Sequence, residues 1–191
     1  MPDLFWIDGP WPGKLAIALR PRGGDWLADE IRGWREAGVG AVASLLTGEE
    51  AVDLGLEEER ELCEAAGIEF HSLPIMDRGV PASHAETTAF LHGLDGVLKR
   101  GANVAVHCRQ GIGRSGLIAA GLLVENGLTP EVAVRRLATH VASPSPKRKN
   151  NGRGSIVWRR RLRARTETYL GTPAARNFGG VAASAKSKPE M

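Results

Sequence analysis

The chain has 191 residues, of which 42% are hydrophobic and 25% are charged, with a formal net charge of +3. A chain of this size and composition folds as one globular domain and needs neither disulfides nor a structural metal to do so. Its two cysteines, Cys63 and Cys108, exclude a disulfide-dense secreted scaffold and a four-cysteine zinc site. The first residues lack the pattern of a signal peptide, and no apolar run reaches membrane-spanning length. The expectation is a cytoplasmic protein without a membrane span.

The charge of the chain changes sign near Ser143. Residues 1–143 carry 13 Lys and Arg against 20 Asp and Glu, whereas residues 144–191 carry 12 against 2. We therefore expect a globular domain over residues 1–143 and a basic, partly disordered C-terminal segment over residues 144–191. Basic segments can bind anions, but aromatic residues are sparse in this one, which favours a solvated tail. Nucleic acid is not an expected partner.

Short apolar runs between Gly and Pro turns alternate with helical patterns along the chain. The expected elements, in chain order, are strands Phe5–Ile7 and Lys14–Leu19, a helix Trp26–Ala37, a strand Ala41–Leu46, a helix Glu57–Ala66, a strand Ile68–Leu73, a helix Ser83–Arg100, a strand Ala102–His107, a helix Arg114–Asn126 and a last helix from Pro130. This alternation predicts an α/β fold, with a central, mostly parallel sheet of four to five strands flanked by helices.

Capping residues mark where several of these helices begin. Asp25 is the expected N-cap of the helix that follows it. Thr47 with Glu50, and Ser83 with Glu86, match the capping box, in which two residues three apart each bond the other's free backbone N–H. These boxes predict helix starts directly after Thr47 and Ser83.

The stretch from Val106 to Gly116 reads Val-His-Cys-Arg-Gln-Gly-Ile-Gly-Arg-Ser-Gly and joins a strand to a helix. Glycines let successive loop N–H groups converge, and free N–H groups at a helix start bind anions. The same groups stabilise a thiolate, so we expect Cys108 to have a pKa of roughly 3.5–7.5 instead of about 8.5. The planar guanidinium of Arg114 can hold two phosphate oxygens, and Ser115 can donate to the sulfur when it leaves.

Other interpretations of this loop fit less well. Gly111, Gly113 and Gly116 match a dinucleotide fingerprint, but the following helix runs into another helix at Thr129 instead of a second strand ending in an acidic residue. A Walker A loop is excluded because Gly-Lys-Ser/Thr is absent. A buried structural cysteine in an ordinary strand-to-helix turn remains the plain alternative, although it does not explain the Cys-x5-Arg-Ser spacing.

The His-Cys-x5-Arg-Ser stretch over residues 107–115 resembles the signature of the cysteine-dependent protein phosphatases. The loop Pro74–Pro81, which reads Pro-Ile-Met-Asp-Arg-Gly-Val-Pro, resembles the acid loop of compact dual-specificity members, particularly the kinase-associated phosphatase branch. The resemblance covers about Gly13 to Val141. Low-molecular-weight phosphatases and arsenate reductases share the Cys-x5-Arg spacing, but they carry it near the N-terminus with the acid downstream. Here the acid lies 31 residues upstream of the cysteine.

The resemblance implies a two-step phosphoryl transfer without a metal or other cofactor. Cys108 attacks phosphorus and forms a phosphocysteine, and Asp77 first protonates the leaving oxygen and then activates water. His107 orients the loop by hydrogen bonding, and Ser115 assists the sulfur as it leaves. The residues expected to bind phosphate are Arg109, Gln110, Gly111, Ile112, Gly113 and Arg114. Arg78 and Arg109 can add positive potential at the rim of the site.

The resemblance therefore implies a phosphatase-like catalytic domain over residues 1–143. This domain is expected to act as a monomer on phosphorylated protein, at Tyr and/or Ser/Thr. Phosphoinositide and nucleotide substrates stay open. Relatives in this branch often place a water with a Gln after the last matched helix, whereas this chain has Arg160 near that place. The departure raises the alternative of a phosphate-binding module without turnover, against which the intact catalytic residues argue. Cys63 is interpreted as a small core residue in preference to a resolving thiol.

Overall fold

The expected α/β architecture is present in a computed structural model of the chain, which describes residues 3–110 and 113–141. Five strands form one sheet in the order β1-β2-β5-β3-β4. Only β1 runs antiparallel to its neighbour; the other pairs are parallel. The strands are β1 (Leu4–Ile7), β2 (Leu15–Leu19), β3 (Val39–Ser44), β4 (Glu69–Ser72) and β5 (Asn103–Cys108). This sheet confirms the mostly parallel arrangement that the sequence predicts.

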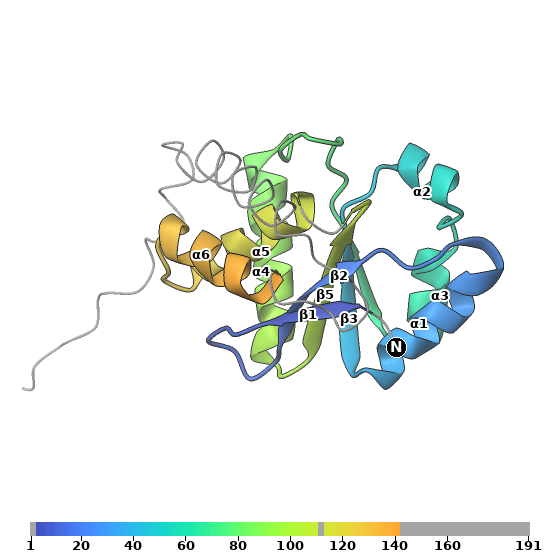
Figure 1. Cartoon of the computed structure of the whole chain (residues 1–191), viewed down its shortest axis with the longest axis horizontal. Helices are drawn as coiled ribbons and strands as arrows, with labels where there is room; N and C mark the ends of the chain where they lie inside the picture. Colours follow the sequence, from blue (N-terminus) through green and yellow to red (C-terminus); the bar gives the residue numbers. More distant parts are fainter. Residues whose placement is uncertain (1–2, 111–112, 142–191) are drawn as a thin grey trace, which may run out of the picture.

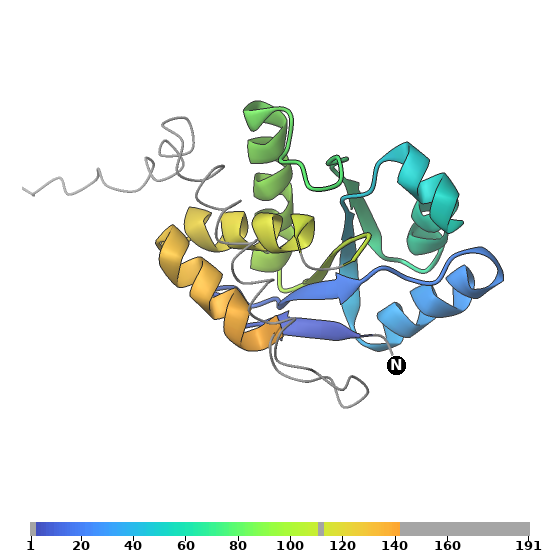
Figure 2. The same ribbon diagram turned by 45° about the horizontal axis from the view of Figure 1, so that its top comes forward.

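Helices cover both faces of the sheet, as Figures 1 and 2 show. They are the short 3-10 turn η1 (Gly24–Trp26), α1 (Leu27–Glu36), α2 (Gly48–Leu54), α3 (Glu59–Ala65), α4 (His84–Lys99), α5 (Arg114–Glu125) and α6 (Pro130–Val141). Helices α1 and α3 pack together on one face, and α4, α5 and α6 form the layer on the other. In the parts of the chain that the structure describes, no helix is both long and apolar enough to cross a bilayer.

Two hydrophobic clusters lie on opposite sides of the central strand β5. Val104, Val106 and Cys108 join the cluster beneath α4–α6, while Ala105 joins the cluster beneath α1 and α3. This division follows from strand geometry, in which successive side chains point to opposite faces. Because β5 is covered on both faces, its apolar residues form a nearly continuous run, as expected for a central parallel strand.

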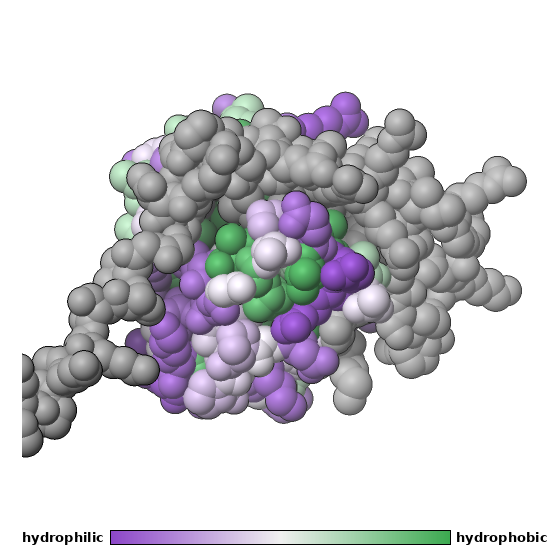
Figure 3. Space-filling view, turned by 90° about the vertical axis from the view of Figure 1, so that its left-hand side faces the viewer, coloured by the Kyte–Doolittle hydropathy of each residue, from purple (hydrophilic) through white to green (hydrophobic). Residues whose placement is uncertain are grey.

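Helix α5 is the most deeply placed helix of the layer. Its first ten residues, from Arg114 to Leu123, are all buried. A Cβ on Gly121 would lie 3.1 Å from the Leu91 side chain of α4, so this glycine permits the close approach of the two helices. Figure 3 views the outer side of this layer, where apolar side chains gather within a frame of hydrophilic ones.

The capping box at Thr47 is confirmed, since both of its hydrogen bonds form. At Ser83 one of the two bonds is present, from the Glu86 N–H to the Ser83 hydroxyl, and α4 begins directly after it. The expected N-cap role of Asp25 is wrong. Asp25 lies inside η1, and α1 begins after Trp26 without a side-chain cap. The reason is Gly24, whose φ of +59° lets the chain enter a tight 3-10 turn before the α-helix.

A buried carboxylate lies at the far end of α5 from the cysteine loop. Neither side-chain oxygen of Glu125 has a hydrogen-bond partner among the described residues, and the Nε2 atom of His92 lies 3.7 Å from its Oε1. Burial raises the pKa of Glu125 to about 7; the charge of Asp95 adds to this rise, and those of His92 and Lys99 oppose it. The folded protein therefore holds a proton at Glu125 more tightly than the unfolded chain does.

We expect this carboxylate to make the fold less stable as pH rises. Its folded pKa of about 7 exceeds the ordinary 4.5, so stability falls as pH rises through the interval between these values. Across that window the loss is about 3 kcal/mol. Glu125→Gln is expected to remove most of this slope when urea unfolding is measured from pH 4.5 to 8. The exposed control Glu61→Gln is expected to keep the slope. If the stability of Glu125→Gln fell with pH in parallel with that of the wild type, Glu125 would not be the group responsible.

Candidate active site

The carboxyl ends of the parallel strands meet at one edge of the sheet, and the candidate site lies there. Cys108 is the last residue of β5, and in the ladder with β2 it stands opposite Leu19. Arg114 begins α5. The loop between them includes Gly111 and Ile112, so the predicted phosphate contacts of these two residues lie outside the described part of the chain. Gly113, also predicted to bind phosphate, precedes the helix without a side-chain cap.

The Cys108 thiol lies at the base of this loop. The residue is 3% exposed, and its Sγ lies 3.5 Å from the Ser115 hydroxyl in the first turn of α5. Burial pushes the thiol pKa up, but hydrogen bonds from the Ser115 hydroxyl and from the N–H groups of Ser115 and Gln110 outweigh it, with help from the charge of Arg114. Together they lower the pKa of Cys108 to about 7. A thiol in this setting is a thiolate in a large fraction of molecules at neutral pH.

The Arg114 side chain is buried, with 2% exposed, and connects three separate segments. Its Nη1 donates to the backbone oxygens of Ile75 at 2.6 Å and Leu45 at 3.3 Å, and to Oε2 of Glu50 at 2.5 Å. Its Nη2 donates to Oε1 of Glu50 at 2.8 Å. Glu50 therefore occupies the Nη1–Nη2 edge of the guanidinium. The hydrogen bonds within the described residues leave the Nε–H and the second N–H of Nη2, which lie along the other edge of the guanidinium and can hold two oxygens of a phosphate.

Glu50 is the residue that sequence reasoning missed, since its capping-box role with Thr47 already explained it. The same carboxylate both accepts from the Thr47 N–H and holds Arg114 in a bidentate ion pair. The hydrogen bond from Arg114 is the main reason that the pKa of Glu50 is lowered, against the opposing effect of burial. A signal exists in the sequence: Glu50 follows β3, whose carboxyl end neighbours that of β5.

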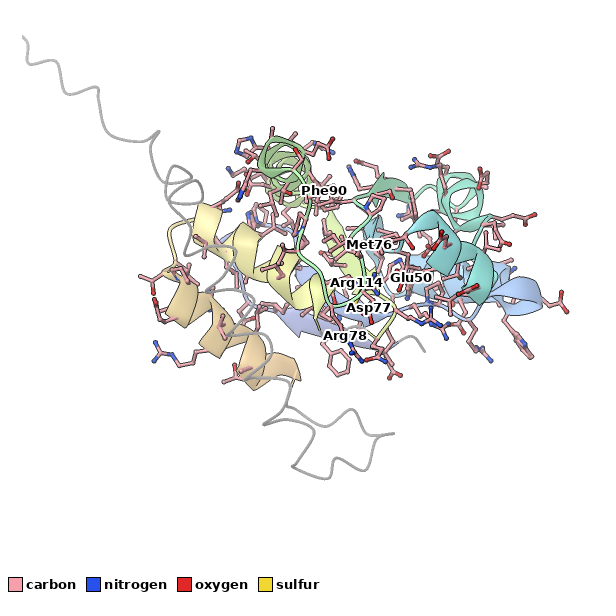
Figure 4. The ribbon with its side chains drawn as sticks, turned by 90° about the horizontal axis from the view of Figure 1, so that it is seen from above. Glu50, Met76, Asp77, Arg78, Phe90 and Arg114 are labelled. Carbon is pink, nitrogen blue, oxygen red and sulfur yellow. The ribbon has the colours of Figure 1, made fainter. Side chains whose placement is uncertain are left out.

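The loop after β4 brings Asp77 to the same site. Its Oδ1 lies 3.7 Å from Nη2 of Arg114, and its side chain is 66% exposed. Ile75 anchors the loop, since its N–H donates to Leu45 O and its own oxygen accepts from Arg114. Figure 4 looks down on this arrangement and shows Asp77 beside Arg114 and Glu50. Residues separated by up to 69 positions thus meet around one guanidinium.

The ring of His107 lies on the other face of the sheet from Cys108, as alternation along β5 requires. Its Nε2 is 2.9 Å from Oε1 of Glu59, without the alignment of a hydrogen bond, and its ring centroid is 5.7 Å from that of Trp34. Neither ring nitrogen makes a hydrogen bond within the described residues. The sequence predicted a hydrogen bond from His107 to the loop. No such bond is present among the described residues, and the ring supports the strand by packing.

Two further arginines line the rim of the site. Arg78 is almost fully exposed, and Arg109 is half exposed with its Nη1 3.8 Å from a carboxylate oxygen of Asp53. Gln110 is exposed, and its contribution to the site is its backbone N–H. Both arginines leave their guanidinium groups near solvent, where they can attract an anionic substrate.

Cys63 lies in the cluster under α1 and α3, whereas Cys108 belongs to the cluster on the opposite face. Burial, together with the charges of Glu59 and Glu64, raises the pKa of Cys63 to about 12. A buried thiol that stays protonated behaves as a small hydrophobic residue, as the sequence favours.

A scan against family models matches residues 18–128, more than half of the chain, to the family described as "Polymorphic toxin system, DSP-PTPase phosphatase". The chain belongs to this family. Members and structural neighbours of the DSP-PTPase family are tyrosine and dual-specificity phosphatases, which are cysteine-dependent hydrolases. The membership agrees with the resemblance carried by the signature over residues 107–115.

A protein of Invertebrate iridescent virus 6 that is named as a tyrosine phosphatase is 36% identical over 84 residues. The match covers 42% of this chain but only 31% of the viral protein. Among solved structures, a kinase-associated phosphatase whose catalytic-site cysteine is replaced by serine is similar with a TM-score of 0.68 and 21% identity, covering 85% of this chain and 97% of that one. The active form of Tk-PTP is similar with a TM-score of 0.59 and 22% identity, covering 86% and 98%. These two likenesses establish the shared fold.

Proposed function

We propose that the chain hydrolyses phosphomonoesters of phosphorylated proteins, at Tyr and/or Ser/Thr, through a phosphocysteine on Cys108. The observation that carries the proposal is one cluster: a thiol with a pKa of about 7, a hydroxyl 3.5 Å from its sulfur, and a guanidinium 3.7 Å from an exposed carboxylate. Nucleophile, anion holder and proton donor are the three parts that phosphoryl transfer needs.

In the first step, the Cys108 thiolate attacks phosphorus and an S–P bond forms as the bond to the leaving oxygen breaks. The Nε–H and the free Nη2–H of Arg114, together with the loop N–H groups, hold the non-bridging oxygens, over which the negative charge is spread in the transition state. Asp77 gives its proton to the leaving oxygen, which departs as a neutral alcohol or phenol. The exposure of Asp77 lets its carboxyl reach the substrate side of the guanidinium.

In the second step, water attacks the phosphocysteine and Asp77, now ionised, takes the proton of this water. The S–P bond breaks and the electron pair returns to sulfur. The Ser115 hydroxyl, 3.5 Å away, donates to the thiolate as it leaves. A module that binds phosphate without turnover is not favoured, because it has no use for a proton donor placed beside the anion holder.

Replacing the proposed acid tests the reaction. Asp77→Asn is expected to slow hydrolysis of phenyl phosphate by about 100-fold, since a poor leaving group needs protonation. With nitrophenyl phosphate, whose phenolate leaves unaided, the loss is expected to be much smaller. Steady-state kinetics on both esters measure this contrast, and Asp53→Asn, another exposed aspartate near the rim, serves as the control. Equal losses on the two esters would mean that another group donates the proton.

The Ser115 hydroxyl makes the largest contribution that lowers the pKa of Cys108. Ser115→Ala is therefore expected to raise the thiol pKa above about 7. Because the thiolate is the reactive form, the rise of kcat/KM with pH should shift to higher pH, with the greatest loss below neutrality. Alkylation of Cys108 by iodoacetate, followed against pH, gives the pKa directly, since buried Cys63 stays protonated. The exposed control Ser72→Ala is expected to keep the midpoint of the wild type. A Ser115→Ala variant with the wild-type midpoint would contradict this role of the hydroxyl.

A further inference from the structure

Met76 is the most exposed large hydrophobic residue in the described part of the chain, with 71% of it accessible to solvent. A single exposed apolar side chain is ordinary on a protein surface. The position of Met76 is not ordinary, because it directly precedes Asp77, whose carboxylate lies against Arg114. Val80, on the same loop, is also exposed. An apolar surface therefore adjoins the proposed proton donor.

The backbone around Met76 is held in place on both sides. Before it, Ile75 is buried and its carbonyl accepts from Arg114 at 2.6 Å. After it, the Gly79 N–H donates to the Met76 carbonyl at 2.8 Å, which closes a turn. Arg78 within this turn has a φ of +58°, a conformation that costs a non-glycine residue energy and that persists only where surrounding contacts hold it. Met76 is thus fixed beside the site and does not lie on a freely moving loop.

We propose that Met76 is a specificity-determining residue that packs on the aromatic ring of a phosphotyrosine substrate. The inference rests on the proposed function. With phosphorus above Cys108 and the leaving oxygen at Asp77, the carbon that carries this oxygen lies further out, level with the loop. Figure 4 shows Met76 beside Arg114 on the side towards α4, with Asp77 on the other side of Arg114.

The groups that lie beyond the leaving oxygen differ between phosphotyrosine and the two aliphatic phosphoresidues. A phosphotyrosine places an aromatic ring there, and a thioether makes favourable contacts with aromatic rings in addition to the burial of apolar surface. Phosphoserine and phosphothreonine have short side chains, so they bring polar peptide groups to the same level. Covering Met76 with those groups leaves them without hydrogen-bond partners, which is unfavourable. Met76 thereby favours the aromatic leaving group.

The test compares a phosphotyrosine peptide with a phosphothreonine peptide of the same flanking sequence, using the full chain. Met76→Ala is expected to lower kcat/KM for the phosphotyrosine peptide by about tenfold and to leave the value for phosphothreonine nearly unchanged. Met76→Leu, which keeps apolar area, is expected to retain most of the preference. Val52→Ala, an exposed apolar residue on α2, is the matched control and should behave as the wild type. The ratio of the two values is independent of how much of each preparation is folded.

Two results would overturn the inference while leaving the proposed function intact. One is a Met76→Ala variant that loses the same factor on both peptides or on neither. The other is a wild-type preference for the phosphothreonine peptide. A wild-type chain that hydrolyses neither peptide nor an aryl phosphate would instead overturn the proposed function, and the role of Met76 with it.

Discussion

Cys108→Ser is expected to abolish turnover while leaving the fold intact. Serine fits the same buried position and can keep the contact with Ser115, but its hydroxyl has a far higher pKa and is a poor nucleophile in a site built for a thiolate. We expect kcat to fall by at least about 10,000-fold, as when other enzymes lose their nucleophile. Steady-state kinetics with an aryl phosphate, together with a thermal melt, separate loss of chemistry from loss of structure.

The chain offers a matched control in its other cysteine. Cys63 is fully buried on the opposite face of the sheet. Cys63→Ser is expected to lower the melting temperature, because it places a hydroxyl in an apolar cluster, and to leave the turnover per folded molecule unchanged. Comparable activity in Cys108→Ser and the wild type would remove Cys108 from the reaction.

Glu50→Ala is expected to cost both stability and activity. It leaves the buried guanidinium of Arg114 without its carboxylate, and breaking a buried ion pair from one side costs about 3–5 kcal/mol. The free energy of unfolding in urea measures this loss. Because Arg114 then loses the contact that fixes its orientation, kcat/KM is expected to fall as well, even in the fraction that remains folded.

Two variants and a pH series sharpen this result. Glu50→Gln keeps the shape of the side chain but removes its charge. Its free energy of unfolding and its kcat/KM are therefore expected to lie between those of the wild type and those of Glu50→Ala. Glu49→Gln, the exposed neighbour on α2, should change little. The pKa of Glu50 is lowered in the folded protein, so its stabilising effect is present above the ordinary carboxyl pKa and is lost as pH falls through the lowered value. A Glu50→Ala protein as stable as the wild type would show that Arg114 does not depend on this carboxylate.

Local patterns in the sequence predict most of the fold. Glycines and capping residues such as Thr47 act within a few positions, so element order and most helix starts can be read directly. The Asp25 prediction failed because the neighbouring Gly24 permitted a tighter turn. Strand alternation alone places His107 and Cys108 on opposite faces, so the position of the histidine ring was available from the sequence.

In the candidate site, local patterns predict some of the residues but not the contacts between them. The signature over residues 107–115 located the cysteine and the arginine, because that spacing is a local property of the strand-to-helix loop. The contact between Glu50 and Arg114 spans 64 positions and depends on how β3 and β5 pair, which no local pattern specifies. The surroundings of Met76 likewise depend on a tertiary contact, the bond from Arg114 to the Ile75 carbonyl.

The phosphoryl group is expected to pass through the sulfur of Cys108 during each turnover. Rapid mixing of the wild-type chain with nitrophenyl phosphate, followed by acid quench and peptide mass spectrometry, tests it most directly, since a good leaving group makes breakdown of the intermediate the slower step. We expect a burst of nitrophenol and a transient phosphoryl group on the peptide that contains Cys108. Steady turnover without a burst, and with that peptide unmodified at every time point, would contradict it.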